Sequence, residues 1–311
     1  MHKYLINEAQ ISLTIEPGGP LLIKAGDTGA DPTRPDMEFV RTYHPNGERA
    51  VYLPGSSLKG VIRAHCERIV RSLDEQKVCN PLEEGKSCVG RKKLKAETAG
   101  DEAYRQSCFI CQMFGNTVLA GHLRTADAYP VDPAAVRTEQ RDGVAIDRVF
   151  GSVAVGPFQL EVVTSGAFQA KLSLHNFSLA QLGLIGLTLR DLKLGRVAIG
   201  FGKSRGLGRV KLNFDSLTIR YPTCEVTNGD VTLLNQRYHF PRAQLAGIGH
   251  FPDLQAYSYP VGQGEQVALP SGLQFGELDN GWGEAGLAVQ GDQVEEIWRA
   301  CMPAWREAMR L

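Results

Sequence analysis

Four of the chain's seven cysteines are close enough in sequence to share one metal ion: Cys79, Cys88, Cys108 and Cys111. Cys108 and Cys111 form a Cys-x2-Cys pair, whose sulfurs can point from a tight turn at one tetrahedral Zn²⁺ while a loop supplies the second pair. The segment between the pairs is polar and charged, so a metal would have to fix it in place of a core. The pattern predicts a structural Zn²⁺ site.

Two other kinds of site fit part of this pattern. His65 could replace one sulfur in a Cys3His site, and the Cys-x2-Cys pair could be redox active if it followed a βαβ strand at a helix N-terminus. The other three cysteines, Cys66, Cys224 and Cys301, have apolar neighbours and are expected to be small core residues.

A glycine-rich loop at residues 200–209 could bind phosphate groups. It combines glycines, including Gly202, with the polar and basic residues Lys203, Ser204, Arg205 and Arg209. Glycine lets backbone N–H groups approach a phosphate, and the cations add charge-assisted hydrogen bonds. Val197 occupies the place of the first glycine of a Walker A loop, and the glycine spacing is wrong for a dinucleotide fingerprint. The loop therefore favours binding of an extended polyanion such as RNA. The alternative is that its glycines form simple hairpin turns and bind no ligand.

A second candidate phosphate site is the start of a predicted helix after Pro54. Apolar residues recur at helical spacing between Leu58 and Leu73, behind Ser56 and Ser57. Lys59 and Arg63 lie one turn apart on another face, and free N–H groups at a helix start attract anions. An ordinary amphipathic helix with a Ser N-cap explains the same residues.

The elements that must position these residues predict an α+β fold. Residues 11–15 alternate as a strand, and residues 121–129 are compatible with another. Residues 158–162 and 168–174 alternate on both sides of Ser165-Gly166, as in a β-hairpin. Ser178 caps a second helix, residues 197–199 and 210–212 are expected strands beside the glycine loop, and residues 294–309 form a terminal helix. This order fits a ferredoxin-like unit carrying insertions.

Composition excludes several classes of protein. The 311 residues are 43% hydrophobic, a share typical of a globular protein. The net charge of +0 argues against a protein held on a polyanion by bulk charge alone. Basic runs at residues 86–95 and 190–211 are balanced by an acidic stretch at residues 261–298. Because no apolar run approaches about 18 residues and no signal peptide is visible, we expect a cytoplasmic protein with no membrane partner.

Four motifs, in this order, resemble signatures of the RAMP superfamily of CRISPR effector proteins. The first is the Pro-Gly-Ser-Ser segment through Arg63, and the second runs from Cys108 through Cys111 to Gly115. The third is Ile146-Asp147-Arg148, and the last is the glycine loop. The resemblance covers about residues 1–220 and is closest to the repeated backbone subunit of type III complexes. Residues 221–311 match no motif.

The resemblance implies a ferredoxin-like (RRM-like) palm over residues 1–220. A zinc region is inserted at about residues 74–115 and a thumb at about residues 131–152, and residues 221–311 form an extension packed on the core. Guide RNA would contact the glycine loop, the first helix and Arg148. The implied partners are CRISPR guide RNA, paired target RNA, other RAMP subunits and the large subunit of a type III effector complex.

The resemblance also implies endoribonuclease activity. Many such subunits cut target RNA beside the thumb with a loop aspartate and a divalent metal, Mg²⁺ or Mn²⁺. The acidic loop at residues 27–36 is in the corresponding place, with Asp36 as the best match and Asp31 as the second choice. The alternatives are a non-cutting scaffold that binds guide RNA and, more distantly, a guide-processing nuclease with a His-centred site. His44 is close in sequence but is expected to be a solvated loop residue.

Overall fold

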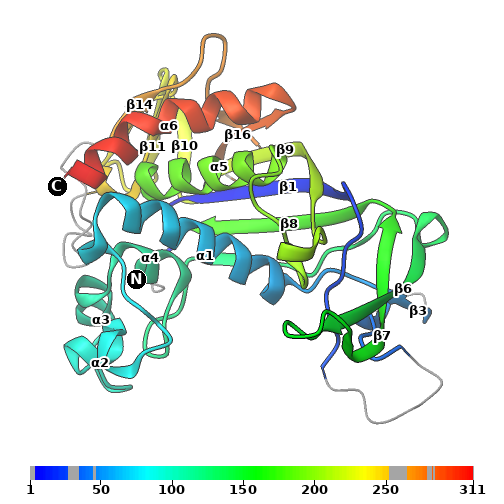
Figure 1. Cartoon of the computed structure of the whole chain (residues 1–311). Helices are drawn as coiled ribbons and strands as arrows, with labels where there is room; N and C mark the ends of the chain where they lie inside the picture. Colours follow the sequence, from blue (N-terminus) through cyan, green and yellow to red (C-terminus); the bar gives the residue numbers. More distant parts are fainter. Residues whose placement is uncertain are drawn as a thin grey trace.

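A computed structural model describes residues 4–26, 35–44, 47–251, 265–278, 282 and 284–310. Its centre is an antiparallel sheet in the order β15-β16-β9-β1-β8-β4, with β5 also paired to β8 (Figure 1). The strands are β1 (Glu8–Pro17), β4 (Leu123–Thr125), β5 (Tyr129–Pro130), β8 (Phe168–His175), β9 (Val210–Tyr221), β15 (Gly276–Glu277) and β16 (Ala285–Gln290).

Three long helices pack in a layer against the sheet (Figure 1). They are α1 (Gly55–Leu73), α5 (Leu179–Lys193) and α6 (Asp292–Arg310). The chain order β1-α1-β4-β8-α5-β9 and the strand order β9-β1-β8-β4 are those of a ferredoxin-like unit, which confirms the expected fold class. None of the described helices has both the length and the apolar character needed to cross a membrane.

The sequence explains why α5 lies at the centre of the helical layer. Ser178 and Gln181 form a capping box that fixes its start, and nearly all of its residues are buried. A Cβ atom on Gly186 would lie 2.3 Å from the side chain of Trp298, so only glycine lets α6 approach this closely. The extension after residue 220 thus adds α6 to the helices and β15 and β16 to the edge of the sheet.

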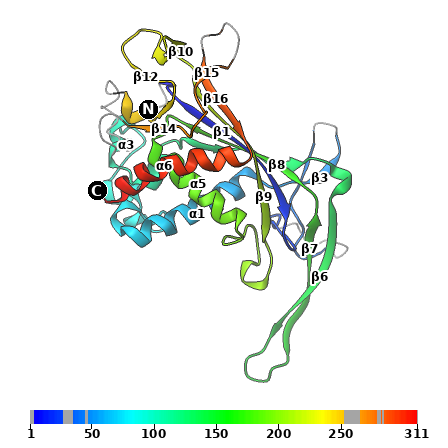
Figure 2. The same cartoon turned by 90° about the horizontal axis from the view of Figure 1, so that it is seen from above.

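Two further parts project from or border this core. A long hairpin reaches away from the body (Figure 2), and a lobe of short helices follows α1. The hairpin comprises η3 (Pro133–Ala135), β6 (Arg137–Ile146) and β7 (Val153–Ser165), and the small pair beside it is β2 (Arg41–Tyr43) and β3 (Arg49–Val51). The lobe comprises η1 (Glu75–Lys77), η2 (Glu84–Lys86), α2 (Cys88–Lys92), α3 (Gly100–Gln106) and α4 (Phe109–Phe114).

The remaining elements are short. The glycine loop contains η4 (Lys203–Arg205). The extension begins with β10 (Cys224–Thr227), β11 (Asp230–Leu233), β12 (His239–Pro241), β13 (Gln244–Ala246), η5 (Ile248–His250) and β14 (Gln266–Ala268).

Three local expectations were wrong. β7 and β8 are strands but do not form the expected hairpin, because Gly166, at φ 118°, turns the chain so that β7 pairs with β6 and β8 with β1. Residues 197–199 form no strand, since their backbone is used within the glycine loop. Helix α1 begins at Gly55 with no side-chain cap, so both serines lie inside its first turn.

A buried carboxylate ties the extension to α5. Glu265 is 6% exposed and accepts backbone N–H bonds from Leu179 and from Gly249, the second at 2.9 Å. Burial raises the pKa of Glu265 to about 7, although the N–H donors favour the charged form. Tyr104, Tyr221 and Cys301 are its neighbouring titratable groups, and burial raises the pKa of all three.

We predict that this carboxylate makes stability depend on pH. Because the folded-state pKa is raised, the native state binds the proton more tightly, so stability is fully present below the unfolded pKa and is lost as pH rises through about 7. The loss between pH 5 and 8 should reach at most about 3 kcal/mol. Chemical denaturation across this range should show a flatter slope for Glu265→Gln than for the exposed control Glu307→Gln. Equal slopes would contradict the prediction.

Candidate metal centre and nucleic-acid interface

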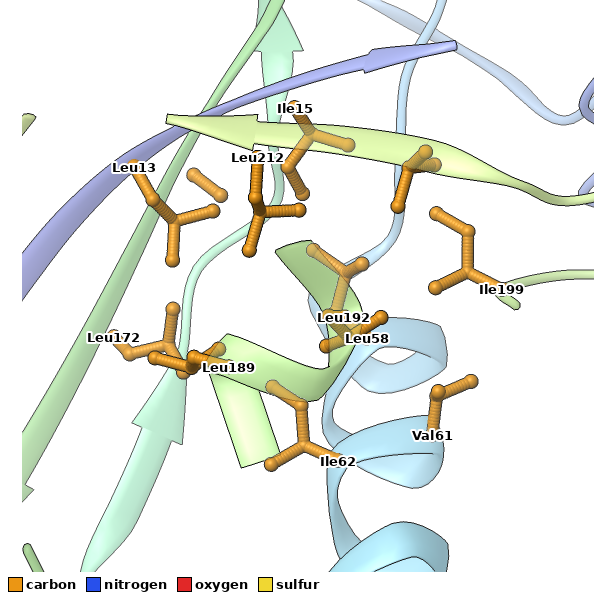
Figure 3. Close-up of a pocket in the computed structure, with 12 residues that line it drawn as sticks. Leu13, Ile15, Leu58, Val61, Ile62, Leu172, Leu189, Leu192, Ile199 and Leu212 are labelled. Carbon is orange, nitrogen blue, oxygen red and sulfur yellow. The ribbon is translucent and has the colours of Figure 1, made fainter. Parts of the chain in front are cut away.

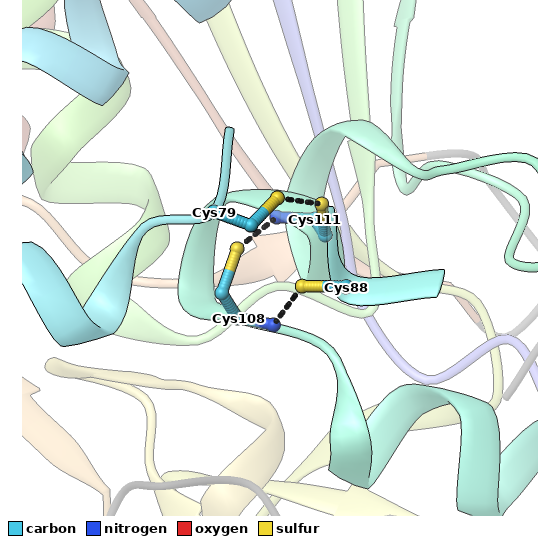
Figure 4. Close-up of side chains that lie close together, drawn as sticks. All are labelled: Cys79, Cys88, Cys108 and Cys111. Carbon is cyan, nitrogen blue, oxygen red and sulfur yellow. Dashed lines mark hydrogen bonds between the residues drawn. The ribbon is translucent and has the colours of Figure 1, made fainter. Parts of the chain in front are cut away.

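The four predicted cysteines converge at the lobe beside α1. Their sulfur atoms all lie within 4.8 Å of one another, and the Cys79 and Cys111 sulfurs are 3.5 Å apart (Figure 4). Tetrahedral zinc with bonds of about 2.3 Å requires sulfurs about 3.8 Å apart, so the spacing fits. Four sulfur donors suit a structural zinc-type metal. His65, the alternative ligand, instead pairs with Asp191 at 2.9 Å.

Short elements place each sulfur. Cys88 begins α2, Cys108 caps α4 and Cys111 lies in the first turn of α4. The Cys108 N–H donates to the Cys88 sulfur at 3.1 Å, which helps to fix the position of that sulfur. Hydrogen bonds from the neighbouring thiols lower the pKa of Cys79 and correspondingly raise that of Cys111. Metal binding would displace the protons that these thiols share through their hydrogen bonds.

The start of α1 already holds an anion of the protein. The Gly55 N–H donates to Asp127 Oδ1 at 2.7 Å, and a Cβ atom at position 55 would lie 2.4 Å from the carbonyl oxygen of Thr125. Asp127 thus takes the place proposed for a phosphate at the first amide, although Ser56 and Ser57 lie in the same turn. Sequence reasoning missed Asp127, which lies inside the strand predicted at residues 121–129 and carries no local signal of this role.

The glycine loop is shaped by close backbone contacts. Gly200 and Gly208 have φ of 75° and 87°, and Cβ atoms there would lie 2.2 and 2.0 Å from carbonyl oxygens of Leu22 and Ile199. The Phe201 N–H donates to the Leu22 carbonyl at 2.7 Å, which joins the loop to the segment after β1. Glycine therefore serves tight packing at these two positions.

The exposed part of the loop carries its cations outward. Lys203, Ser204 and Arg205 are exposed in η4, and the Arg205 guanidinium lies 4.9 Å from the ring centre of Phe201. Gly202, at φ 69°, precedes them, and Arg209 is exposed at the end of the loop. These are the predicted phosphate contacts, and they face solvent.

The loop lies beside α1. Leu58 and Val61 of α1 line the same apolar cavity as Ile199 at the loop's start (Figure 3). Burial and the nearby Arg68 lower the pKa of Lys203, so these two cations are neighbours. Arg68, which the sequence analysis did not single out, therefore extends the positive surface of the loop along α1.

The two other predicted contacts on α1 differ in their surroundings. Burial and Arg63 lower the pKa of Lys59. Arg63 instead contacts the metal lobe, with its guanidinium 3.5 Å from the Cys111 sulfur. The structure thus brings Arg63 to the cysteines, whereas it brings Lys203 to Arg68.

Asp36 lies at the root of the projecting hairpin. Its exposed carboxylate accepts the Gln159 N–H of β7 at 2.7 Å through Oδ2. The next residue, Met37, continues the contact, because its N–H donates to the Gln159 carbonyl at 3.0 Å. Asp31 and the rest of the acidic loop over residues 27–34 lie outside the described residues.

An ion pair that the sequence did not reveal holds residues 39–41 against β7. Glu161 of β7 accepts the Phe39 N–H at 3.0 Å and an Arg41 donor at 2.7 Å. Although burial opposes ionisation, the hydrogen bond from Arg41 lowers the pKa of Glu161. His44 is not a solvated loop side chain, since its ring packs edge-on against Tyr129 with centroids 4.9 Å apart.

Arg148 lies at the other end of the hairpin. It is exposed in the turn between β6 and β7, next to Phe150, which is 83% exposed. Asp147 fixes that turn by accepting the Val149 N–H at 2.6 Å. Figure 2 shows that the turn between β6 and β7 lies at the far end of the hairpin, away from α1 and the glycine loop.

Comparison with known proteins agrees with this arrangement. No curated protein matches the chain significantly. The model of the RAMP superfamily, however, matches residues 14–211, which extend from β1 through α1, the cysteine lobe and the hairpin to the glycine loop. Since this match spans more than half of the chain, the protein belongs to the RAMP superfamily of CRISPR-associated, RNA-binding proteins.

Proposed function

We propose that the protein is a guide-RNA-binding backbone subunit of a type III CRISPR effector complex, and that it cleaves the paired target RNA. The observation that carries the proposal is the attachment of Asp36 to β7, which puts an exposed carboxylate at the root of a long projecting hairpin. Its partners would be guide RNA, target RNA, further RAMP subunits and the large subunit of the complex.

Guide binding would use the cations of the glycine loop. Lys203 and Arg205 are exposed, and Lys203 has Arg68 as a neighbouring cation. Adjacent cations repel one another, and a phosphate between them relieves this repulsion. Such contacts read the RNA backbone and not its sequence, which base pairing with the guide would supply.

Cleavage would use the nucleophile that RNA itself carries. The 2′-hydroxyl gives its proton to water and its oxygen attacks the adjacent phosphorus; the P–O5′ bond breaks and O5′ takes up a proton from water, which leaves a 2′,3′-cyclic phosphate and a 5′-hydroxyl. The protein then has to align these atoms and stabilise developing charge. Asp36 Oδ2 is engaged by Gln159, and a hydrated ion would be held by Oδ1, for which the described residues supply no hydrogen bond. Bound there, Mg²⁺ or Mn²⁺ would supply Lewis-acid stabilisation.

Replacing both loop cations should weaken RNA binding and reduce its salt dependence. For Lys203→Ala with Arg205→Ala, each lost phosphate contact should lower the slope of log affinity against log salt by about 0.7 to 0.9. Titrations of the full chain at several salt concentrations measure this slope. Arg306→Ala with Arg310→Ala removes two exposed cations of α6 and is the charge-matched control. If both double variants kept the wild-type slope, the loop would be structural.

Replacing Asp36 with Asn should strongly reduce target cleavage and leave RNA binding intact. Asn retains an oxygen that can accept the Gln159 N–H, so the segment stays attached while the charge is lost. Target cleavage by the assembled complex should fall on the order of 100-fold. Glu38→Gln alters a neighbouring carboxylate as control. Undiminished cleavage would favour the scaffold function or a role for Asp31.

Metal analysis of the purified chain should find about one zinc ion per molecule. Cys108→Ser with Cys111→Ser should lose it, whereas Cys66→Ala, a buried cysteine beside Thr188, should keep it. Chelation should also expose the lobe to proteases, because its helices α2, α3 and α4 are short. A zinc-free, protease-resistant wild-type chain would refute the assignment.

A further inference from the structure

We propose that Arg63 is a positioning residue of the cysteine metal centre and does not contact RNA. In this role its guanidinium offsets the negative charge of the thiolates and fastens the metal lobe to α1. The proposal depends on a zinc-type ion at the four cysteines.

All three nitrogens of the Arg63 guanidinium point at protein acceptors. Nη2 donates to the Cys111 sulfur at 3.5 Å, Nη1 to the Gly115 carbonyl at 3.0 Å and Nε to Glu67 at 2.8 Å. The side chain is 22% exposed. These contacts use one donor on each of the three nitrogens and leave two of the five N–H donors, so they fix the plane of the guanidinium against the metal lobe.

The positive charge of Arg63 opposes the negative charge of the metal-bound thiolates. Four thiolates around one Zn²⁺ carry two net negative charges, which burial makes costly. The Cys108 N–H donates to the Cys88 sulfur at 3.1 Å, but a backbone amide brings only a dipole. Arg63, which is also paired with Glu67, brings a positive charge to a different sulfur, that of Cys111. Outer partners of this kind orient metal ligands and tune the affinity of the site.

Arg63 also attaches the cysteine lobe to α1 through a backbone carbonyl. Gly115 has φ 85°, and a Cβ atom there would lie 2.6 Å from the Gly121 N, so its carbonyl is held in a tightly packed turn. Two turns further along α1, Arg71 donates to the Cys79 carbonyl at 3.4 Å. The two arginines therefore tie both cysteine-bearing loops to one helix.

Arg63 also lies where a chelator would reach the metal. Cys79, Cys88 and Cys111 border an open cleft of about 810 Å³, and Arg63 lines the same cleft. Its guanidinium covers the Cys111 sulfur on this side. Removing the side chain should therefore both weaken the charge balance and open a path for chelators.

The test compares Arg63→Ala with Lys59→Ala, which removes a cation one helical turn earlier, in the purified full chain. Two quantities are measured: the rate of zinc release to a chromophoric chelator and the salt slope of RNA affinity. Arg63→Ala should speed zinc release by about 10- to 100-fold and leave the salt slope unchanged. Lys59→Ala should leave zinc release unchanged and reduce the slope if Lys59 contacts a phosphate.

Further variants keep the test decisive. Arg63→Lys retains the charge without the planar fork, so its zinc release should be intermediate. If Arg63→Ala fails to fold, Arg63→Gln removes the charge while keeping a long side chain and should also speed release. Unchanged zinc release in these variants would overturn the proposal, as would a reduced salt slope in Arg63→Ala. A wild-type chain that binds zinc but no RNA would refute the proposed function while the release rates still test Arg63.

Discussion

Burial of one face of α1 against the sheet fixes the rotation of that helix, and the rest of the structure depends on this rotation. Leu58, Ile62, Cys66 and Val70 are each at most 5% exposed and recur every four residues. With about 100° between successive residues, the two flanks of the buried stripe then face different neighbours. Arg63 and Arg71 reach the cysteine lobe from one flank, while His65 and Arg68 face α5 and the glycine loop from the other.

The same rotation explains which parts of the site could be predicted. Apolar spacing predicted α1, and the clustered cysteines predicted the metal centre, because both signals are local. Arg63 was grouped with Lys59 because they are one turn apart, yet only Arg63 meets a sulfur and a carbonyl from residues 111–115. Asp127 and Glu161 act on segments 72 and 122 residues away, and no local pattern reports such partners.

The fold shows the same division between local and distant information. Alternation predicted β1 and β8, and the N-cap residue Ser178 predicted α5. The choice of strand partners was not local: β8 alternates inward residues and pairs with β1 in the sheet, whereas β7 follows β6 outward. The start of α1 was also misplaced, because the sequence favours a serine cap while the carbonyl of Thr125 demands glycine at position 55.

Strand β7 changes character along its length, and this gives the hairpin a firm root. Residues 153–157 are exposed, whereas Leu160, Val162 and Val163 are buried. The buried half bonds to Leu21 after β1 and to Met37 beside Asp36, so Asp36 is fixed to the same strand that carries the hairpin. A ligand gripped by the outer half would therefore be held in register with the Asp36 carboxylate, without any requirement for the tip and the carboxylate to touch.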